Sequence, residues 1–295
     1  GVLHRSWEEN NMIKDVYNTY QIVLIGLGGT GGLLSTLLSR YIYDKSRQNN
    51  CSFALSLVDG DRVEEKNIVR QPFGKDDLNQ FKSDSLCDAY SYLYGIDVSS
   101  VPKFIDTPED IENIFNSIPY EQQWRYELKP HRIIIGAVDN HRARQVMNDY
   151  FIKNHCNDNS DLLYIDSANE FDFGTCICGY RMCDEIIYPP RAAFFPDILE
   201  DKGKSASELS CGEINISAPQ HLVTNMTAAN IIFSDFCNFV EEGTVSGGVT
   251  SFYPLSNTMV HRNIDVYGDC KSLTANYLHF SKQCSDRIKA GDTND

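Results

Sequence analysis

The sequence lacks several features that would assign it to common classes of protein. No apolar run comes near the roughly 20 residues that a membrane-spanning helix needs. No positively charged start precedes an apolar segment, so we expect no secretion signal. Positive charge is scarce, with 26 Lys and Arg against 41 Asp and Glu and a net charge of -15. This balance argues against nucleic acid as the main partner, because phosphate backbones are bound by basic surfaces.

The ten cysteines include no Cys-x-x-Cys pair, although Cys176 and Cys178 form one Cys-x-Cys. Such cysteine pairs are a common source of structural zinc ligands, and without them we predict no zinc. Scattered cysteines without a secretion signal are typical of reduced thiols, and we expect a cytoplasmic protein. Cys176 and Cys178 would share one face of a strand as small buried residues. The isolated His131, His221 and His261 are expected to be surface residues or satisfied core residues.

What the sequence does contain is an alternation of short apolar segments with segments of helical character. Strands are expected at residues 21–25, 53–59, 101–105, 131–139 and 161–168. Helices are expected at residues 6–18, 33–43, 76–94 and 140–155. This alternation predicts parallel β-α-β units and a doubly wound, Rossmann-like α/β sheet.

The second half of the chain has a different pattern. Residues 173–183 alternate and predict an antiparallel strand, whereas residues 196–213 are polar and typical of a mobile connection. From Leu222 to Val240 apolar residues recur every three or four positions, which predicts one helix packed on a core or dimer surface. A hairpin is expected over residues 245–267. The mostly parallel sheet would therefore be extended by C-terminal antiparallel strands.

A glycine-rich turn follows the first expected strand. The sequence GLGGTGG places Gly26, Gly28, Gly29 and Gly31 between that strand and a helix. Such glycines allow a tight turn, a close approach of backbone to phosphate, and packing of helix on strand. The helix start offers free N–H groups to an anion. Asp59, at the end of the next strand, would accept hydrogen bonds from ribose hydroxyls, which fits NAD as well as ATP.

The residues after Asp59 favour a triphosphate. Arg70 and Lys82 could neutralise phosphate oxygens, and Asn67 could donate to them without adding charge. Asp139 ends the fourth expected strand and would supply an oxygen ligand to Mg²⁺. Such charges would stabilise departing pyrophosphate, whereas hydride transfer needs none of them.

These motifs carry a resemblance. GLGGTGG, VDGD-x-VE-x-x-N-x-x-RQ, a later lysine, and VDN with Arg144 resemble the ThiF/MoeB-type superfamily of adenylating enzymes, over roughly residues 20–250. GGTGG, DGDRVEEKN, LSCGE and HRN look most like bacterial ThiF-family proteins of PRTRC and ubiquitin-like conjugation operons. The resemblance implies an N-terminal helical arm over residues 1–20, an adenylation domain over residues 21–267 with a crossover segment at about 184–213, and a polar tail over residues 268–295.

The resemblance also implies a function. ATP and Mg²⁺ would bind over the glycine turn, and the C-terminal carboxylate of a ubiquitin-like protein would attack the α-phosphate. The implied contacts are ribose at Asp59, phosphates at Asn67, Arg70 and Lys82, and the metal at Asp139.

Other site residues keep two interpretations. Gln71 would shape the site or be a structural amide. Asp61 would contact the ligand, open a helix or brace a loop. Asn140 and Arg144 would serve the site, or cap and brace the following helix.

Two further roles depend on the resemblance. Cys211, in SCGE before the long helix, would take the acyl group as a thioester, or would be a structural thiol. Arg5 is the only arginine before the first strand. In a homodimer it would reach the γ-phosphate of the ATP bound to the other subunit, or it would be an exposed helix arginine.

Several alternatives stay open. A sulfur-carrier adenylyltransferase would lack the thioester step. An NAD-dependent oxidoreductase would leave Asn67, Arg70 and Lys82 without a role. An inactive scaffold subunit would bind the carrier protein without forming AMP. The expected partners are a ubiquitin-like protein, a conjugating enzyme and a second copy of the chain, with no membrane.

Overall fold

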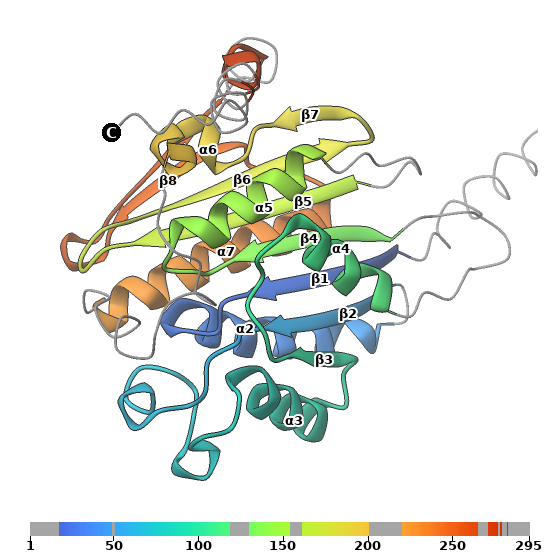
Figure 1. Cartoon of the computed structure of the whole chain (residues 1–295), viewed down its shortest axis with the longest axis vertical. Helices are drawn as coiled ribbons and strands as arrows, with labels where there is room; N and C mark the ends of the chain where they lie inside the picture. Colours follow the sequence, from blue (N-terminus) through green and yellow to red (C-terminus); the bar gives the residue numbers. More distant parts are fainter. Residues whose placement is uncertain are drawn as a thin grey trace, which may run out of the picture.

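The structure is a computed structural model, which describes residues 18–48, 51–118, 130–153, 161–200 and 220–264, together with 271–276, 278 and 282. A single mixed sheet runs through the molecule in the order β3-β2-β1-β4-β5-β6-β8-β9, with β7 paired to β6 (Figure 1). The parallel part consists of β1 (Asn18–Ile25), β2 (Cys51–Val58), β3 (Val98–Val101), β4 (His131–Gly136) and β5 (Asp161–Asn169). The antiparallel part consists of β6 (Gly174–Met182), β7 (Glu185–Tyr188), β8 (Gly248–Tyr253) and β9 (Thr258–Asn263). The predicted fold class is confirmed.

Helices cover both faces of the sheet. On one face lie α2 (Gly29–Ser46), α3 (Lys82–Tyr94) and α7 (Leu222–Glu242); on the other lie α4 (Pro108–Ser117) and α5 (His141–Lys153). Short helical turns are α6 (Arg191–Phe194), η2 (Glu65–Asn67), η3 (Lys75–Asp77), η4 (Pro196–Glu200) and η6 (Pro254–Ser256). Figure 1 shows α5 and α4 in front of the strands, with α7 and α2 behind them.

The two helical layers follow from the period of two along each strand. In β1, Ile22 and Leu24 pack in the core beneath α2 and α7, whereas Val23 and Ile25 pack in the core beneath α4 and α5. Successive side chains of a strand point to opposite faces, so an uninterrupted apolar strand is buried on both sides. This explains why the short apolar segments predict central strands so well.

The third strand was predicted in the wrong place. The prediction was residues 101–105, but β3 is Val98–Val101 and pairs with Leu55–Val58 of β2. Lys103 N donates to Val101 O at 2.8 Å, so the chain turns just after the strand. Pro102 at this turn has no N–H for a sheet ladder. The turn carries Phe104 away from the sheet edge and into the candidate site.

Other boundaries also differ from the predictions. β1 begins at Asn18, which pairs with Cys51, so the predicted helix 6–18 does not include Asn18; residues 6–17 lie outside the described part. β4 ends at Gly136, which leaves Asp139 in the following loop. At the start of the predicted mobile connection, Pro196–Glu200 forms η4 with Ile198 buried. In the predicted tail, residues 271–276 are helical.

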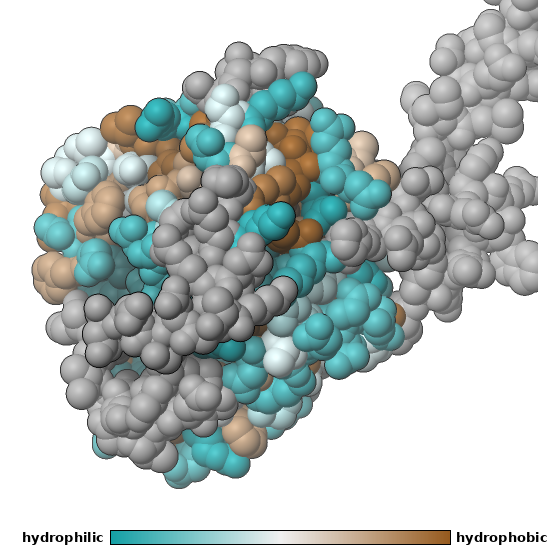
Figure 2. All heavy atoms as spheres, turned by 45° about the horizontal axis from the view of Figure 1, so that its top comes forward, coloured by the Kyte–Doolittle hydropathy of each residue, from teal (hydrophilic) through white to brown (hydrophobic). Residues whose placement is uncertain are grey.

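The surface of the described residues is mixed. Figure 2 shows hydrophobic side chains gathered in the upper half of that view and hydrophilic ones over much of the lower half. Exposed large apolar residues on the β8–β9 hairpin are Tyr253, Leu255, Met259 and Val260. None of the helices among the described residues is both long and apolar enough to cross a membrane.

Candidate active site

A cavity of about 380 Å³ opens at the carboxyl ends of the parallel strands. It lies at the end of β1, which has β2 as its neighbour on one side and β4 on the other. The direction of the chain connections reverses there, and open parallel sheets bind ligands at this position. Ten of the predicted ligand residues line this one cavity: Gly26, Gly28, Gly29, Asp59, Asp61, Asn67, Arg70, Gln71, Lys82 and Asp139. Gly26 and Asp139 are 113 positions apart in the sequence, and the fold brings both of them to this cavity.

Close contacts with backbone atoms explain two of the four glycines. Gly26 has a φ of +89°, and a Cβ there would lie 2.6 Å from Ala137 O. Gly31 does not line the cavity; a Cβ there would lie only 1.8 Å from Gly26 O, so this position needs glycine to let α2 approach β1. By contrast, a Cβ at Gly28 would meet nothing within 4 Å. Gly28 thus leaves open space above the turn, where a phosphate can approach.

Replacing Gly31 with alanine is expected to destabilise the protein by about 3 kcal/mol, because a backbone contact cannot yield as a side chain would. Gly28→Ala is the matched control and should change the free energy of unfolding by less than about 1 kcal/mol. Urea unfolding followed by circular dichroism would measure both. Equal stability of the two variants would contradict the packing role of Gly31.

Asp59 organises the loops around the cavity. Its Oδ2 accepts from Leu27 N at 2.6 Å, and its Oδ1 accepts from Asp61 N at 2.8 Å. Burial raises the pKa of this carboxyl, and the nearby Lys82 ammonium acts against that rise. Asp59 therefore connects the glycine turn, through Leu27, to the turn that contains Asp61. Each carboxylate oxygen of Asp59 keeps a lone pair for a ligand hydroxyl.

Lys82 is the buried cation of the site. Its Nζ donates to Asp61 Oδ2 at 3.0 Å, and its N donates to Asp61 O at 2.9 Å. Burial would lower the pKa of Lys82, but Asp59, Asp61 and Asp139 outweigh burial and raise it. Asp61 thus holds the start of α3 and the ammonium of Lys82 in place, as the loop-bracing interpretation of this residue predicted.

Asn67 is the last residue of η2, and Arg70 and Gln71 come from the turn that follows it. Asn67 Oδ1 accepts from Glu64 N at 2.8 Å, so only its Nδ2 can serve a phosphate. Arg70 Nη1 makes a long bond of 3.4 Å to Gln220 O, which leaves most of the guanidinium for a ligand. Gln71 Oε1 is buried and finds no donor among the described residues. The phosphate-binding roles of Asn67 and Arg70 stay predictions, and all three residues line the cavity.

Asp139 is the candidate metal ligand, whereas the nearby Asn140 and Arg144 have structural roles. Asp139 is exposed at the cavity, close enough to raise the pKa of Lys82. Asn140 Oδ1 accepts from Ala143 N at 2.8 Å and caps α5. Arg144 is buried and donates to Val138 O and to Ser167 O. Asn140 and Arg144 therefore cap and brace, as one of their two interpretations predicted, and they hold the loop that carries Asp139.

The residues around the cavity fit a magnesium–nucleotide complex. Mg²⁺ is usually held by one or two carboxylates together with phosphate oxygens, and not by a full set of protein ligands. Asp139 supplies one exposed carboxylate beside the cations that would hold the phosphates. Within the described ranges no three His, Cys, Asp or Glu side chains form a metal-binding group of their own. When bound, magnesium would neutralise phosphate charge, and the protein residues would position it.

Sequence reasoning missed part of the cavity lining. Phe104 and Ile105 follow the misplaced third strand, and with Val138 they give the cavity an apolar part near Asp59. Thr30, Asn169, Gln220 and Asn225 give it an amide-rich part. The sequence signal for Phe104 is Gly60, a weak one. A Cβ on Gly60 would lie 2.7 Å from the Phe104 ring, so a glycine at this position makes room for the ring. The amide-rich part has no local sequence pattern.

Cys176, Cys178, His131 and His261 do not line the cavity. Cys176 and Cys178 are buried in the core, and burial raises both thiol pKa values, as expected of small buried residues. His131 is bonded to Asp161 at 2.9 Å, and His261 to Thr250 at 2.8 Å. Cys211 and Arg5 lie outside the described residues, so their predicted roles stay predictions.

Comparison with known proteins supports this fold. The family model described as "ThiF family" matches residues 8–157, which is just over half of the 295-residue chain. No curated protein matches the chain. Among solved structures, Escherichia coli MccB with ATP has 15% identity and a TM-score of 0.57, over 86% of this chain and 66% of that chain. E. coli MccB with AMPCPP and MccA has 15% identity and a TM-score of 0.56, over 85% and 65%.

A third solved structure, PaaA, has 14% identity and a TM-score of 0.53, over 83% of this chain and 64% of that chain. At such identities the likeness shows a shared fold, and this chain spans less than two thirds of each of these three proteins. The family assignment depends instead on the family model and its extent. The chain belongs to the ThiF family.

Proposed function

We propose that this protein is an ATP-dependent adenylyltransferase that activates the C-terminal carboxylate of a ubiquitin-like protein. The observation that carries the proposal is the single cavity in which Asp59, Arg70, Lys82 and Asp139 meet. A ribose acceptor, two cations for phosphates and an exposed carboxylate for magnesium are the parts that phosphoryl activation needs. Membership of the ThiF family supports the proposal, as do the related folds solved with ATP and with MccA.

The reaction has two bond exchanges. A carboxylate oxygen of the substrate attacks the α-phosphorus, the bond to pyrophosphate breaks, and acyl-adenylate forms. Arg70 and Lys82 would stabilise the charge that collects on pyrophosphate. The thiolate of Cys211 would then attack the acyl carbon, release AMP and hold the substrate as a thioester. Arg5 of a second subunit would contact the γ-phosphate in a homodimer, and a conjugating enzyme would take the acyl group onward.

The alternatives make different use of the cavity. A sulfur-carrier adenylyltransferase would use the same phosphate residues and stop at the adenylate. An NAD-dependent oxidoreductase would give no role to Lys82, which is buried among Asp59, Asp61 and Asp139. A scaffold subunit would have no need to keep this set of charges. The arrangement around Lys82 therefore favours adenylation over the other two classes.

The experiment is ATP–pyrophosphate exchange with candidate ubiquitin-like proteins from neighbouring genes. We expect exchange that depends on the carrier and on magnesium, and at least a 100-fold loss in Asp139→Ala, in line with the removal of one charge-stabilising group. Asp149→Ala, an exposed aspartate on α5, is the matched control. Exchange at the wild-type rate in Asp139→Ala would contradict the assignment of this carboxylate.

A non-reducing gel would separate the two adenylation pathways. A thiol-sensitive adduct with the carrier that disappears in Cys211→Ala would support the thioester step. An adduct that survives in this variant would refute the choice of Cys211. Exchange without any adduct would favour the sulfur-carrier alternative, and NADH-dependent turnover without exchange would favour the oxidoreductase.

A further inference from the structure

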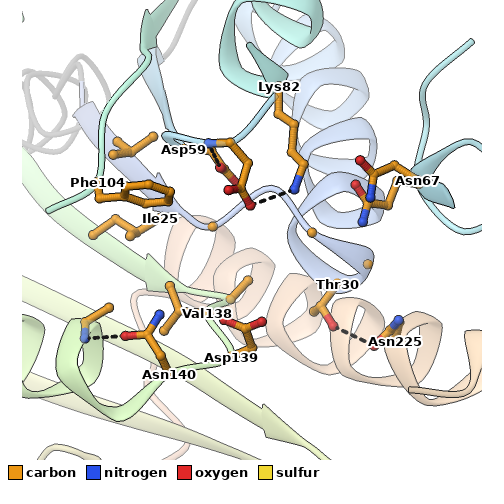
Figure 3. A pocket seen from close by; sticks show the side chains of 18 of the residues that line it. Ile25, Thr30, Asp59, Asn67, Lys82, Phe104, Val138, Asp139, Asn140 and Asn225 are labelled. Carbon is orange, nitrogen blue, oxygen red and sulfur yellow. Dashed lines mark hydrogen bonds and ion pairs between the residues drawn. The ribbon is translucent and has the colours of Figure 1, made fainter. Parts of the chain in front are cut away.

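The amide group of Asn225 has a fixed orientation at the cavity. This residue lies in the first turn of α7, is only 2% exposed, and lines the same cavity as Lys82. Its Oδ1 accepts from Thr30 Oγ1 at 3.2 Å and from Asn169 Nδ2 at 3.4 Å (Figure 3). Because the oxygen has these two donors, the nitrogen must point the other way. No hydrogen bond among the described residues uses Asn225 Nδ2.

This unused donor lies against the start of α2. A Cβ placed on Gly29 would be 2.1 Å from Asn225 Nδ2, so the nitrogen touches the backbone of the first helical residue. The start of a helix favours an anion because its N–H groups have no partners within the helix. Asn225 adds a side-chain donor at the same point, on a residue that lines the cavity. Both features indicate an anionic ligand beside Gly29.

The position along the nucleotide identifies the anion. Asp59, the ribose candidate, holds Leu27 N in the glycine turn at 2.6 Å. The phosphate adjoining the ribose would therefore lie nearest to Gly28 and Gly29, and the remaining phosphates would extend toward Arg70 and Lys82. We propose that Asn225 Nδ2 donates a hydrogen bond to an oxygen of the α-phosphoryl group, as a catalytic residue of the adenylation step. This proposal rests on the proposed function.

The chemistry of a neutral donor suits this position. The α-phosphorus is the atom that the substrate carboxylate attacks, so negative charge on its oxygens must be stabilised without a cation that would bind the carboxylate instead. A fixed amide N–H does this with no reorganisation during the reaction. Thr30 and Asn169 would act through Asn225 as positioning residues. A purely structural Asn225 would only fasten α7 to α2, and the two roles can be separated by measurement.

The test compares two ligands that differ by one phosphate. Isothermal titration would give the Kd of AMP and of adenosine for the wild type and for Asn225→Ala. We expect AMP to bind about 10- to 100-fold more weakly in the variant, the usual effect of losing a hydrogen bond to a charged group, and adenosine to change less than about 2-fold. Asn230→Ala, exposed on the same helix, is the matched control and should change neither Kd.

A second variant guards against a folding defect. Asn225→Asp keeps the oxygen that accepts from Thr30 and Asn169 but replaces the donor with an oxygen, so AMP binding should fall further while adenosine binding stays. Equal losses for AMP and adenosine, or a loss seen with ATP but not with AMP, would overturn the inference. Wild-type protein that binds neither ligand would overturn the proposed function as well, whereas wild-type binding that both Asn225 variants retain would overturn the inference alone.

Discussion

Replacing Lys82 with methionine is expected to weaken ATP binding about 100-fold and to slow AMP formation by a factor of about 10² to 10³, because the cation that we propose to face the phosphates is lost. Adenosine binding should change little, since adenosine carries no phosphate. The reason for the large effect is the local charge: without the lysine, Asp59, Asp61 and Asp139 would repel a triphosphate. Titration calorimetry with ATP and adenosine, and carrier-dependent AMP release, would measure these changes.

Lys75→Met is the matched control for this variant. Lys75 is exposed in η3 and does not line the cavity. Its replacement by methionine removes the same charge from the protein as Lys82→Met does. A loss of ATP affinity that is equal in both variants would mean that Lys82 acts only through net charge. A loss confined to Lys82→Met would support direct contact with phosphate.

Replacing Asp166 with alanine is expected to lower the free energy of unfolding by about 3 to 5 kcal/mol, the usual cost of removing one partner from a buried ion pair. Asp166 is completely buried on β5 and pairs with Arg191, which is itself buried, and with Arg144 at 3.5 Å. The substitution would leave two arginines in the core without a carboxylate. Urea unfolding followed by fluorescence would measure the change.

The matched control for Asp166 is Asp149→Ala. Asp149 pairs with Lys153 one turn away on the surface of α5, where such pairs contribute a few tenths of a kcal/mol. If Asp166→Ala cost no more than Asp149→Ala, the buried cluster would have no role in stability. The expected loss matters for function too, because Arg144 also holds Val138 O, next to Asp139.

The cluster of Asp166, Arg144 and Arg191 also connects the two halves of the sheet. Arg191 Nη1 donates to Thr175 Oγ1 at 2.9 Å and Nη2 to Asp166 O at 2.9 Å, which links parallel β5 to antiparallel β6 beneath α6. No sequence pattern distinguishes Asp166 or Arg191, since an arginine after two prolines has no distinctive pattern. Burial gives Arg191 its importance, and burial depends on the packed fold.

The sequence by itself determined the local geometry of the candidate nucleotide site. The apolar segments of β1 and β2, the glycines between β1 and α2, and Asp59 at the end of β2 lie within 42 residues, from Asn18 to Asp59. Short-range sterics decide such features, because glycine is required where a Cβ would meet backbone and buried strands must be apolar on both faces. The same reasoning failed for β3, where a proline turn and an exposed edge gave a weaker pattern.

Only the tertiary structure decided which polar groups complete the cavity. Thr30 and Asn225 are 195 positions apart, yet they share a hydrogen bond at the start of α2. A lone asparagine in an apolar helix pattern carries no sign of its partner, because its hydrogen bonds depend on how α7 packs across the sheet. The sequence could therefore place the glycines and the charges, whereas the donors and acceptors between them follow from contacts that form only when distant segments meet.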